Sequence, residues 1–193
     1  MNIINEILEE DGFYHIYNRG INGCQIFDNE ENYLFFLSKF LKYLLDYVDV
    51  YAYCLMPNHF HFLIKVKSSV INNRIDNPNL KGLHSSASIV SKQFGKFISS
   101  YTQSYNKLNN RHGALLESPF KRIQVKNEEY LKNLVLYIHL NPKDYKSYKF
   151  SSYLGMISVS KTNVKREEII EIFEDVENFI YLHENPPKFD FKF

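Results

Sequence analysis

The chain has 193 residues, of which 45% are hydrophobic and 16% aromatic, so it can bury one full core and is unlike a disordered protein. The formal net charge of +1 hides an uneven distribution, with −6 over residues 1–60, +8 over residues 61–132 and −1 over residues 133–193. A basic middle third is typical of a nucleic-acid-binding face, and solvated surface lysines are the simpler alternative.

The cysteines and the N-terminus indicate an ordinary intracellular environment. Cys24 and Cys54 are the only cysteines, too few for a disulfide framework or a zinc cluster. The N-terminus has no basic segment followed by a long apolar stretch, so neither secretion nor membrane spanning is indicated. We therefore expect a cytoplasmic protein with no membrane partner.

The first two thirds of the chain predict strands and helices in the order β-α-β-β-α-β. Strands are expected at Phe13–Asn18, Val50–Leu55, His59–Val66 and within Leu115–Val125. Helices are expected from Asp28, which would cap the first of them, to about Tyr47 and from Ser85 to about Asn106, and a loop from Ser68 to Leu80. This order is that of an α+β, ferredoxin-like antiparallel sheet with helices on one face.

A further helix is predicted over Asn127–Pro142, because an Asn cap and two acidic residues open it and a proline closes it. Leu131, Leu134, Val135 and Ile138 would form its core stripe. Asn163–His183 reads as one or two amphipathic helices before a Pro-rich tail. We expect a domain over residues 1–153, including the appended helix, and a helical C-terminal extension over residues 154–193.

The strand His59–Val66 carries a pair of histidines. Side chains alternate along a strand, so His59, His61 and Leu63 share one face while Phe60 and Phe62 lie on the other. The apolar face buries the strand, and the open face presents two imidazoles that can reach one cation. The alternative is a pair of half-buried histidines that only bond their neighbours.

Tyr137 and Asn141 are spaced i, i+4 on the predicted appended helix. At about 100° per residue they fall on one flank of the core stripe, together with Tyr130. A phenol and a carboxamide can therefore meet one target. Alternatively, Tyr137 is a core aromatic and Asn141 merely ends the helix before Pro142. His15 and His139 are equally ambiguous, and we assign them structural roles.

Four motifs in order resemble the single-tyrosine HUH transposases, specifically the REP-associated tyrosine transposases of the transposase 17-like superfamily. The motifs are Tyr14–Gly20 (YHIYNRG), Met56–His61 (MPNHFH), Gly113–Phe120 and Tyr137–Pro142 (YIHLNP). The tyrosine follows the histidine pair, as in replication and transposition enzymes of the HUH class and unlike relaxases. The resemblance runs from Phe13 to about Tyr153 and fades in the extension.

The resemblance implies a metal-dependent endonuclease that cuts and rejoins hairpin-associated single-stranded DNA during transposition. Tyr137 would be the nucleophile and form a 5′-phosphotyrosine, and His59, His61 and Asn141 would hold Mg²⁺ or Mn²⁺. Exchanging one phosphoester for another retains the bond energy, so rejoining needs no ATP. Relatives act as monomers or as homodimers, and the extra C-terminal segment favours a monomer.

Basic residues interleaved with aromatics suggest where DNA would bind. The candidates are Arg19, Lys92, Lys96, Lys107, Arg111, Lys121 and Arg122. Phe97 and Tyr101 lie i, i+4 on a predicted helix, which more often marks a core than a base-stacking surface.

Two other functions stay open. The chain could be a non-catalytic module that binds single-stranded nucleic acid, a common role of ferredoxin-like sheets. It could also be a metal-dependent phosphodiester hydrolase in which the histidine pair activates water and Tyr137 is structural. The presence of both histidines, Tyr137 and Asn141 argues against the binding module. A covalent protein–DNA adduct would separate the transposase from the hydrolase.

Overall fold

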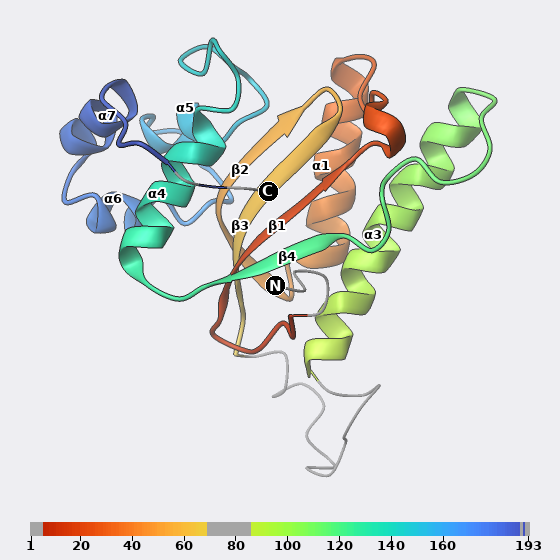
Figure 1. The fold of residues 1–193 in the computed structure, drawn as a ribbon, viewed down its shortest axis with the longest axis horizontal. Helices are drawn as coiled ribbons and strands as arrows, with labels where there is room; N and C mark the ends of the chain where they lie inside the picture. Colours follow the sequence, from red (N-terminus) through yellow and green to blue (C-terminus); the bar gives the residue numbers. More distant parts are fainter. Residues whose placement is uncertain (1–5, 69–85, 190, 192–193) are drawn as a thin grey trace.

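The computed structural model describes residues 6–68, 86–189 and 191. Its centre is an antiparallel sheet of β1 (Phe13–Arg19), β2 (Val48–Met56), β3 (His59–Val66) and β4 (Lys121–Val125), in the spatial order β2-β3-β1-β4 (Figure 1). The predicted strands and the ferredoxin-like element order are confirmed. The predicted loop from Ser68 to Leu80 lies, apart from Ser68, outside the described residues.

One face of the sheet packs against α1 (Glu30–Leu44) and α3 (Ser86–Leu108). Phe62 of β3 stacks on Phe40 of α1 with ring centroids 4.3 Å apart, and Phe60 lies 5.1 Å from Phe36. Aromatic rings of this size dominate the energy of a core. Tyr101 of α3 is 1% exposed and donates to a backbone carbonyl, so the core interpretation of this tyrosine is confirmed.

The predicted cap of α1 was wrong by one residue. The side chain of Asn29, and not Asp28, accepts a hydrogen bond from the Asn32 amide, 3.1 Å away. Asn29 has the extended backbone that a helix cap needs. Asp and Asn cap about equally well, so residue type alone could not choose between these neighbours. The short helix η1 (Ile21–Gly23) follows β1.

The opposite face of the sheet is covered by α4 (Glu128–His139), which is the predicted appended helix (Figure 1). Its cap is Asn127, and its predicted stripe of Leu131, Leu134, Val135 and Ile138 is buried. The expectation of an open face on β3 is therefore wrong, because His61 is only 4% exposed. Helices lie on both faces of the sheet: α1 and α3 cover one, and α4 covers the face that carries the histidines.

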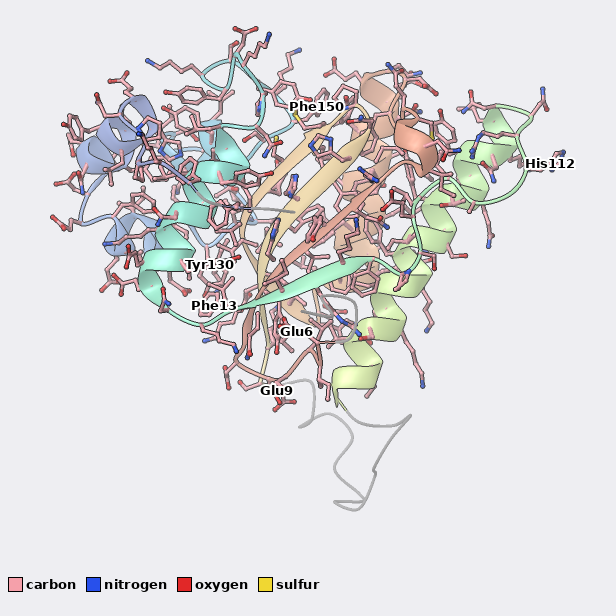
Figure 2. The ribbon with its side chains drawn as sticks, in the orientation of Figure 1. Glu6, Glu9, Phe13, His112, Tyr130 and Phe150 are labelled. Carbon is pink, nitrogen blue, oxygen red and sulfur yellow. The ribbon has the colours of Figure 1, made fainter. Side chains whose placement is uncertain are left out.

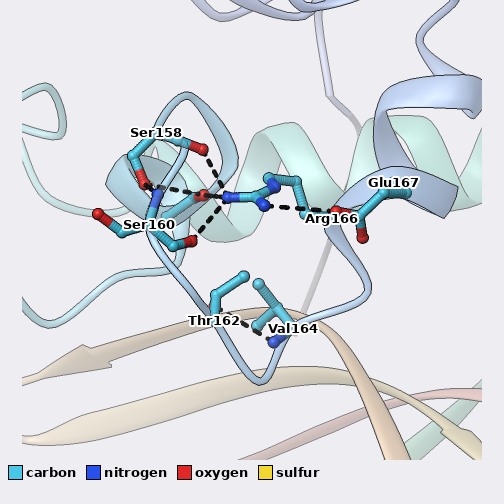
Figure 3. Close-up of polar contacts among 7 residues, drawn as sticks. Ser158, Ser160, Thr162, Val164, Arg166 and Glu167 are labelled. Atoms are coloured by element: carbon cyan, nitrogen blue, oxygen red, sulfur yellow. Dashed lines mark hydrogen bonds and ion pairs between the residues drawn. The ribbon is translucent and has the colours of Figure 1, made fainter.

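The extension adds α5 (Tyr153–Met156), α6 (Arg166–Ile172) and α7 (Val176–Glu184). The chain that follows α4 also pairs with the outer edge of β2, where Leu55 N donates to Phe150 O and Lys165 N donates to Val50 O. This pairing covers an otherwise exposed strand edge. Arg166 donates to carbonyls of the α5–α6 loop, including that of Ser160 at 2.9 Å (Figure 3).

Side chains of the extension belong to the same core as the rest of the chain. Met156, Ile169, Phe173 and Phe179 are each at most 1% exposed, within the buried cluster that also contains the sheet. The segment Asn163–His183, predicted to form one or two amphipathic helices, forms two, α6 and α7. Among the helices of the described residues, none combines the length and the apolar character needed to cross a membrane.

Candidate functional site

The candidate site lies on the face of the sheet beneath α4. Strand pairing places His59 opposite Arg19 and His61 opposite Tyr17, and α4 packs on β2 and β3. Tyr137 and Asn141 thereby reach the two histidines from a segment about eighty residues further along the chain. The structure brings together all four residues that the sequence selected for chemistry.

Asn141 does two things at once. The helix ends at His139, and the Asn141 carboxamide nitrogen donates back to the Tyr137 carbonyl at 3.1 Å. Because that bond occupies the nitrogen, the carboxamide oxygen faces His59, with Oδ1 3.2 Å from Nε2. The residue therefore ends the helix, as the simpler interpretation held, and also presents an oxygen to the histidine pair.

The aromatic ring of Tyr137 packs edge-on against the imidazole ring of His61. The two centroids are 5.6 Å apart and the rings are nearly perpendicular, at 88°. Burial raises the pKa of the Tyr137 phenol, and a hydrogen bond with the Asn141 side chain opposes that rise. The phenol is consequently neutral near pH 7, and its ionisation needs positive charge nearby.

Two aromatic residues of the C-terminal tail cover Tyr137. The Phe191 ring lies 5.2 Å from Tyr137 and 5.3 Å from Tyr130, and Phe189 lies 6.5 Å from Tyr137. These rings keep Tyr137 half-buried on its outer side. From the sequence we assigned the tail no role, although its phenylalanines on alternate positions, which include Phe189 and Phe191, were an available signal.

His59 faces a carboxamide oxygen on each side. Its Nδ1 lies 2.7 Å from Asn58 Oδ1 and its Nε2 lies 3.2 Å from Asn141 Oδ1. Burial lowers the pKa of His59, and the Asn141 bond opposes this, so the ring is neutral and carries one N–H. One ring nitrogen must therefore turn a lone pair toward a carboxamide oxygen, an arrangement that a shared cation would stabilise.

His61 is held from beneath by a residue that the sequence assigned a structural role only. His15 Nε2 lies 2.8 Å from His61 Nδ1, and the two rings stack 5.0 Å apart. Tyr17 stacks on both imidazoles. Strand alternation from Phe13 places His15, Tyr17 and Arg19 on one face of β1. That pattern was the available signal, but sequence alone did not show that β1 lies beside β3.

Two of the predicted DNA-binding residues lie at the rim of this site. Arg19 and Lys121 both pair with Glu117, the lysine at 3.1 Å, and Lys121 lies over the Tyr17 ring. The Arg19 guanidinium lowers the pKa of Glu117. Glu117 thus forms ion pairs with two basic side chains close to the histidines. The sequence did not identify it as a functional residue.

The other predicted DNA-binding residues lie elsewhere. Lys92 and Lys96 are exposed on α3, and Arg122 reaches Ser91 of that helix at 2.7 Å. Lys107 and Arg111 line a pocket of about 470 Å³ that His112 also lines. Figure 2 shows His112 on the far side of the molecule from Tyr130 of α4. The structure therefore places only Arg19 and Lys121 next to the histidine pair.

The candidate metal donors are two imidazoles and one carboxamide. Over the described part of the chain, no group of three or more His, Cys, Asp or Glu side chains is arranged to hold a metal ion. The Asn141 carboxamide oxygen, 3.2 Å from His59 Nε2, is a candidate third donor. Two nitrogen donors and one neutral oxygen donor are compatible with Mn²⁺ and Mg²⁺.

Comparison with solved structures finds a protein described as the REP-associated tyrosine transposase bound to a REP hairpin. The likeness has a TM-score of 0.54 at 14% sequence identity and covers 81% of this chain and 86% of that chain. At this identity the match shows a shared fold. No protein-family model and no curated protein matches the chain.

The buried histidines predict a loss of stability in mild acid. Burial lowers the pKa of His15 to about 3 and that of His61 well below its ordinary value. In the unfolded chain these histidines bind protons near pH 6.5, whereas in the folded protein they stay neutral to lower pH. The free energy of unfolding is therefore highest above pH 6.5 and declines as pH falls toward the pKa values of the folded protein. Thermal unfolding in metal-free buffer should show a Tm that falls between about pH 7 and pH 5.

The His15→Leu variant, which lacks one buried base, should show a smaller fall over the same pH range. A parental Tm that stays constant or rises on acidification would contradict the assignment of neutral, buried imidazoles.

Proposed function

We propose that this protein is a metal-dependent endonuclease that cuts and rejoins hairpin-associated single-stranded DNA through a covalent tyrosine intermediate, as a transposase does. The observation that carries the proposal is the convergence of Tyr137, Asn141, His59 and His61 on one face of the sheet. The shared fold with a REP-associated tyrosine transposase supports it.

In this proposal His59, His61 and Asn141 hold Mg²⁺ or Mn²⁺. Asn58 would keep the proton of His59 on Nδ1 and leave Nε2 for the ion. His15 would do the same for His61, whose Nδ1 it contacts. When bound, the ion polarises the scissile phosphate and stabilises the charge that develops during attack.

Tyr137 would attack the scissile phosphorus. Its phenolic oxygen forms a bond to phosphorus while the bond to the 3′ oxygen breaks, leaving a 5′-phosphotyrosine and a free 3′-hydroxyl. The phenol proton leaves to solvent, and the departing 3′ oxygen takes one up. Asn141 orients the phenol by its hydrogen bond. Reversal of the same steps rejoins the strand.

The proposed substrate is single-stranded DNA next to a hairpin. The similar structure is bound to a REP hairpin, and Arg19 and Lys121 offer positive charge beside the proposed ion site. The tyrosine and the histidines come from the same chain, so a monomer would hold a complete site. We therefore propose action as a monomer.

Replacing Tyr137 with Phe should abolish the covalent adduct and leave DNA binding intact, because the variant loses only the attacking oxygen. The assay incubates protein with Mn²⁺ and end-labelled hairpin DNA carrying single-stranded flanks, followed by a denaturing gel. Tyr130→Phe is the matched control, since Tyr130 lies on the same helix and also contacts Phe191, and it should form adduct at the parental rate.

Each other outcome of this assay excludes the proposal. Cleavage without any adduct would favour the phosphodiester hydrolase. Binding without cleavage in the parent would favour the non-catalytic module.

Substitution of the proposed ligands should weaken Mn²⁺ binding to different extents. His59→Ala or His61→Ala should reduce affinity by more than the roughly 10- to 100-fold typical of outer-shell changes. Asn141→Ala should act more mildly, because water can replace one oxygen ligand. Calorimetric titration of the protein without DNA measures this. Parental affinity in either histidine variant would refute the metal assignment.

Charge reversal at the rim should change the salt dependence of DNA binding. Lys121→Glu should weaken binding and lower the slope of log affinity against log salt by about one or more, because phosphate contacts release counterions. Lys161→Glu makes the same charge change in the exposed α5–α6 loop and should leave the slope unchanged. Equal effects of the two variants would contradict a role for Lys121 in phosphate contact.

A further inference from the structure

A second pair of histidines, His139 and His183, connects α4, the helix that carries Tyr137, to α7. His139 Nδ1 is 2.9 Å from His183 Nε2, and His139 Nε2 is 2.7 Å from Ser152 Oγ. The three residues are at most 2% exposed, and none of them takes part in the chemistry proposed above. They belong to the last turn of α4, to the segment along the edge of β2 and to α7, which lies beside α4 (Figure 1).

The hydrogen-bond partners of His183, His139 and Ser152 allow one assignment of donors and acceptors. His183 Nδ1 donates to the Phe179 carbonyl at 2.7 Å, so Nε2 of the neutral ring is an acceptor. His139 must then donate from Nδ1, which leaves its Nε2 to accept from the Ser152 hydroxyl. Ser152 Oγ in turn accepts from the Tyr53 amide of β2 at 2.9 Å. The Ser152 hydroxyl also lies 3.3 Å from the Tyr53 carbonyl oxygen, but His139 Nε2, at 2.7 Å, is the closer of its two acceptors. We call this chain of hydrogen bonds from His183 through His139 to Ser152 the relay.

The surroundings make the relay rigid. Phe179 lies 4.2 Å from the His183 ring and 5.9 Å from that of His139, and Tyr153 lies 4.9 Å from His183. In such an apolar setting, leaving a buried polar atom without its hydrogen-bond partner costs about 1–3 kcal/mol of folding free energy. A rotation or a slide of α4 would break the bond to Ser152 or the bond to His183, so the relay resists both movements.

His139 lies between Tyr137 and Asn141 in sequence, so hydrogen bonds that hold His139 in place also limit movement of these two residues of the candidate site. His139 lies two residues after Tyr137 and two before Asn141, and at about 100° per residue its side chain leaves the helix nearly opposite to that of Tyr137. A turn of α4 by about 20° would carry a side chain about 6 Å from the helix axis through about 2 Å. Misplacement by 1 Å can cost about 100-fold in rate.

We propose that Ser152, His139 and His183 are positioning residues that fix the rotation of α4, and thereby aim Tyr137 and Asn141 at the histidine pair. This inference deepens the proposed function and rests on it. It gives the C-terminal extension a role in the reaction, because α7 supplies one end of the relay and the edge of the sheet supplies the other.

The test compares two replacements of His183. In His183→Leu the apolar volume remains but the acceptor for His139 Nδ1 is lost. In His183→Gln the carboxamide oxygen can accept in place of Nε2. Tyr181→Ser, at a position on α7 that is 60% exposed, is the control. Each protein is assayed for hairpin DNA affinity and for the single-turnover rate of adduct formation with Mn²⁺.

His183→Leu should bind DNA like the parent but form adduct about tenfold or more slowly. His183→Gln should regain most of the rate, and Tyr181→Ser should match the parent. A folded His183→Leu protein that reacts at the parental rate would overturn the proposal. So would a His183→Gln protein as slow as His183→Leu, or a loss of DNA affinity that parallels the loss of rate.

Two further measurements complete the test. Should His183→Leu fail to fold, Ser152→Ala removes the other end of the relay and must show the same selective loss of rate. Nitrogen-15 NMR of the parent reports the relay without any reaction, and both His139 and His183 should carry their proton on Nδ1. A proton on Nε2 of either ring would refute the relay, whereas an intact relay in a parent that forms no adduct would refute only the proposed function.

Discussion

The packing of α4 on the sheet determines the rest of the site. The buried stripe of Leu134, Val135 and Ile138 holds the helix on β2 and β3. That contact brings Asn141 Oδ1 to 3.2 Å from His59 Nε2 and sets the Tyr137 ring against His61. Without it, the histidines and the tyrosine would be unrelated side chains on separate elements. The hydrophobic effect thus supplies the geometry in which the proposed chemistry operates.

Each histidine of the pair contacts a further polar side chain that helps to hold it in place. His15 supports His61 from within the sheet, and Asn58 supports His59 from the turn before β3. Gly20, just after β1, donates its amide to the Asn58 carbonyl at 2.8 Å, and only glycine fits there because a Cβ would overlap the Cys24 carbonyl oxygen. Close backbone approach therefore helps to fix the position of His59.

Much of this arrangement could be predicted from sequence because it follows from local rules. Alternation along β3 separated His59 and His61 from Phe60 and Phe62, and helical spacing placed Tyr137 near Asn141. Those rules describe single elements and do not say which elements become neighbours. The contact between His15 and His61 and the relay from His139 to His183 join residues 46 and 44 positions apart, so no local pattern could reveal them.

The same limitation explains the errors. The histidine face was expected to be open because the sequence does not show on which side of the sheet an appended helix packs, and α4 covers it. Basic residues were grouped by their place in the chain, yet Arg19 and Lys121 lie at the rim of the site while Lys107 and Arg111 lie on the far side. Nearness in sequence does not fix nearness on a surface.

The most direct test of the account is the position of the covalent bond. Parent protein is allowed to react with hairpin DNA and Mn²⁺, the adduct is trapped, and its peptides are mapped by mass spectrometry. We predict a 5′-phosphate on Tyr137, because among the tyrosines of the described residues it is the one that interacts with Asn141, which also contacts His59. A phosphate on Tyr130, Tyr101 or Tyr105 would contradict it.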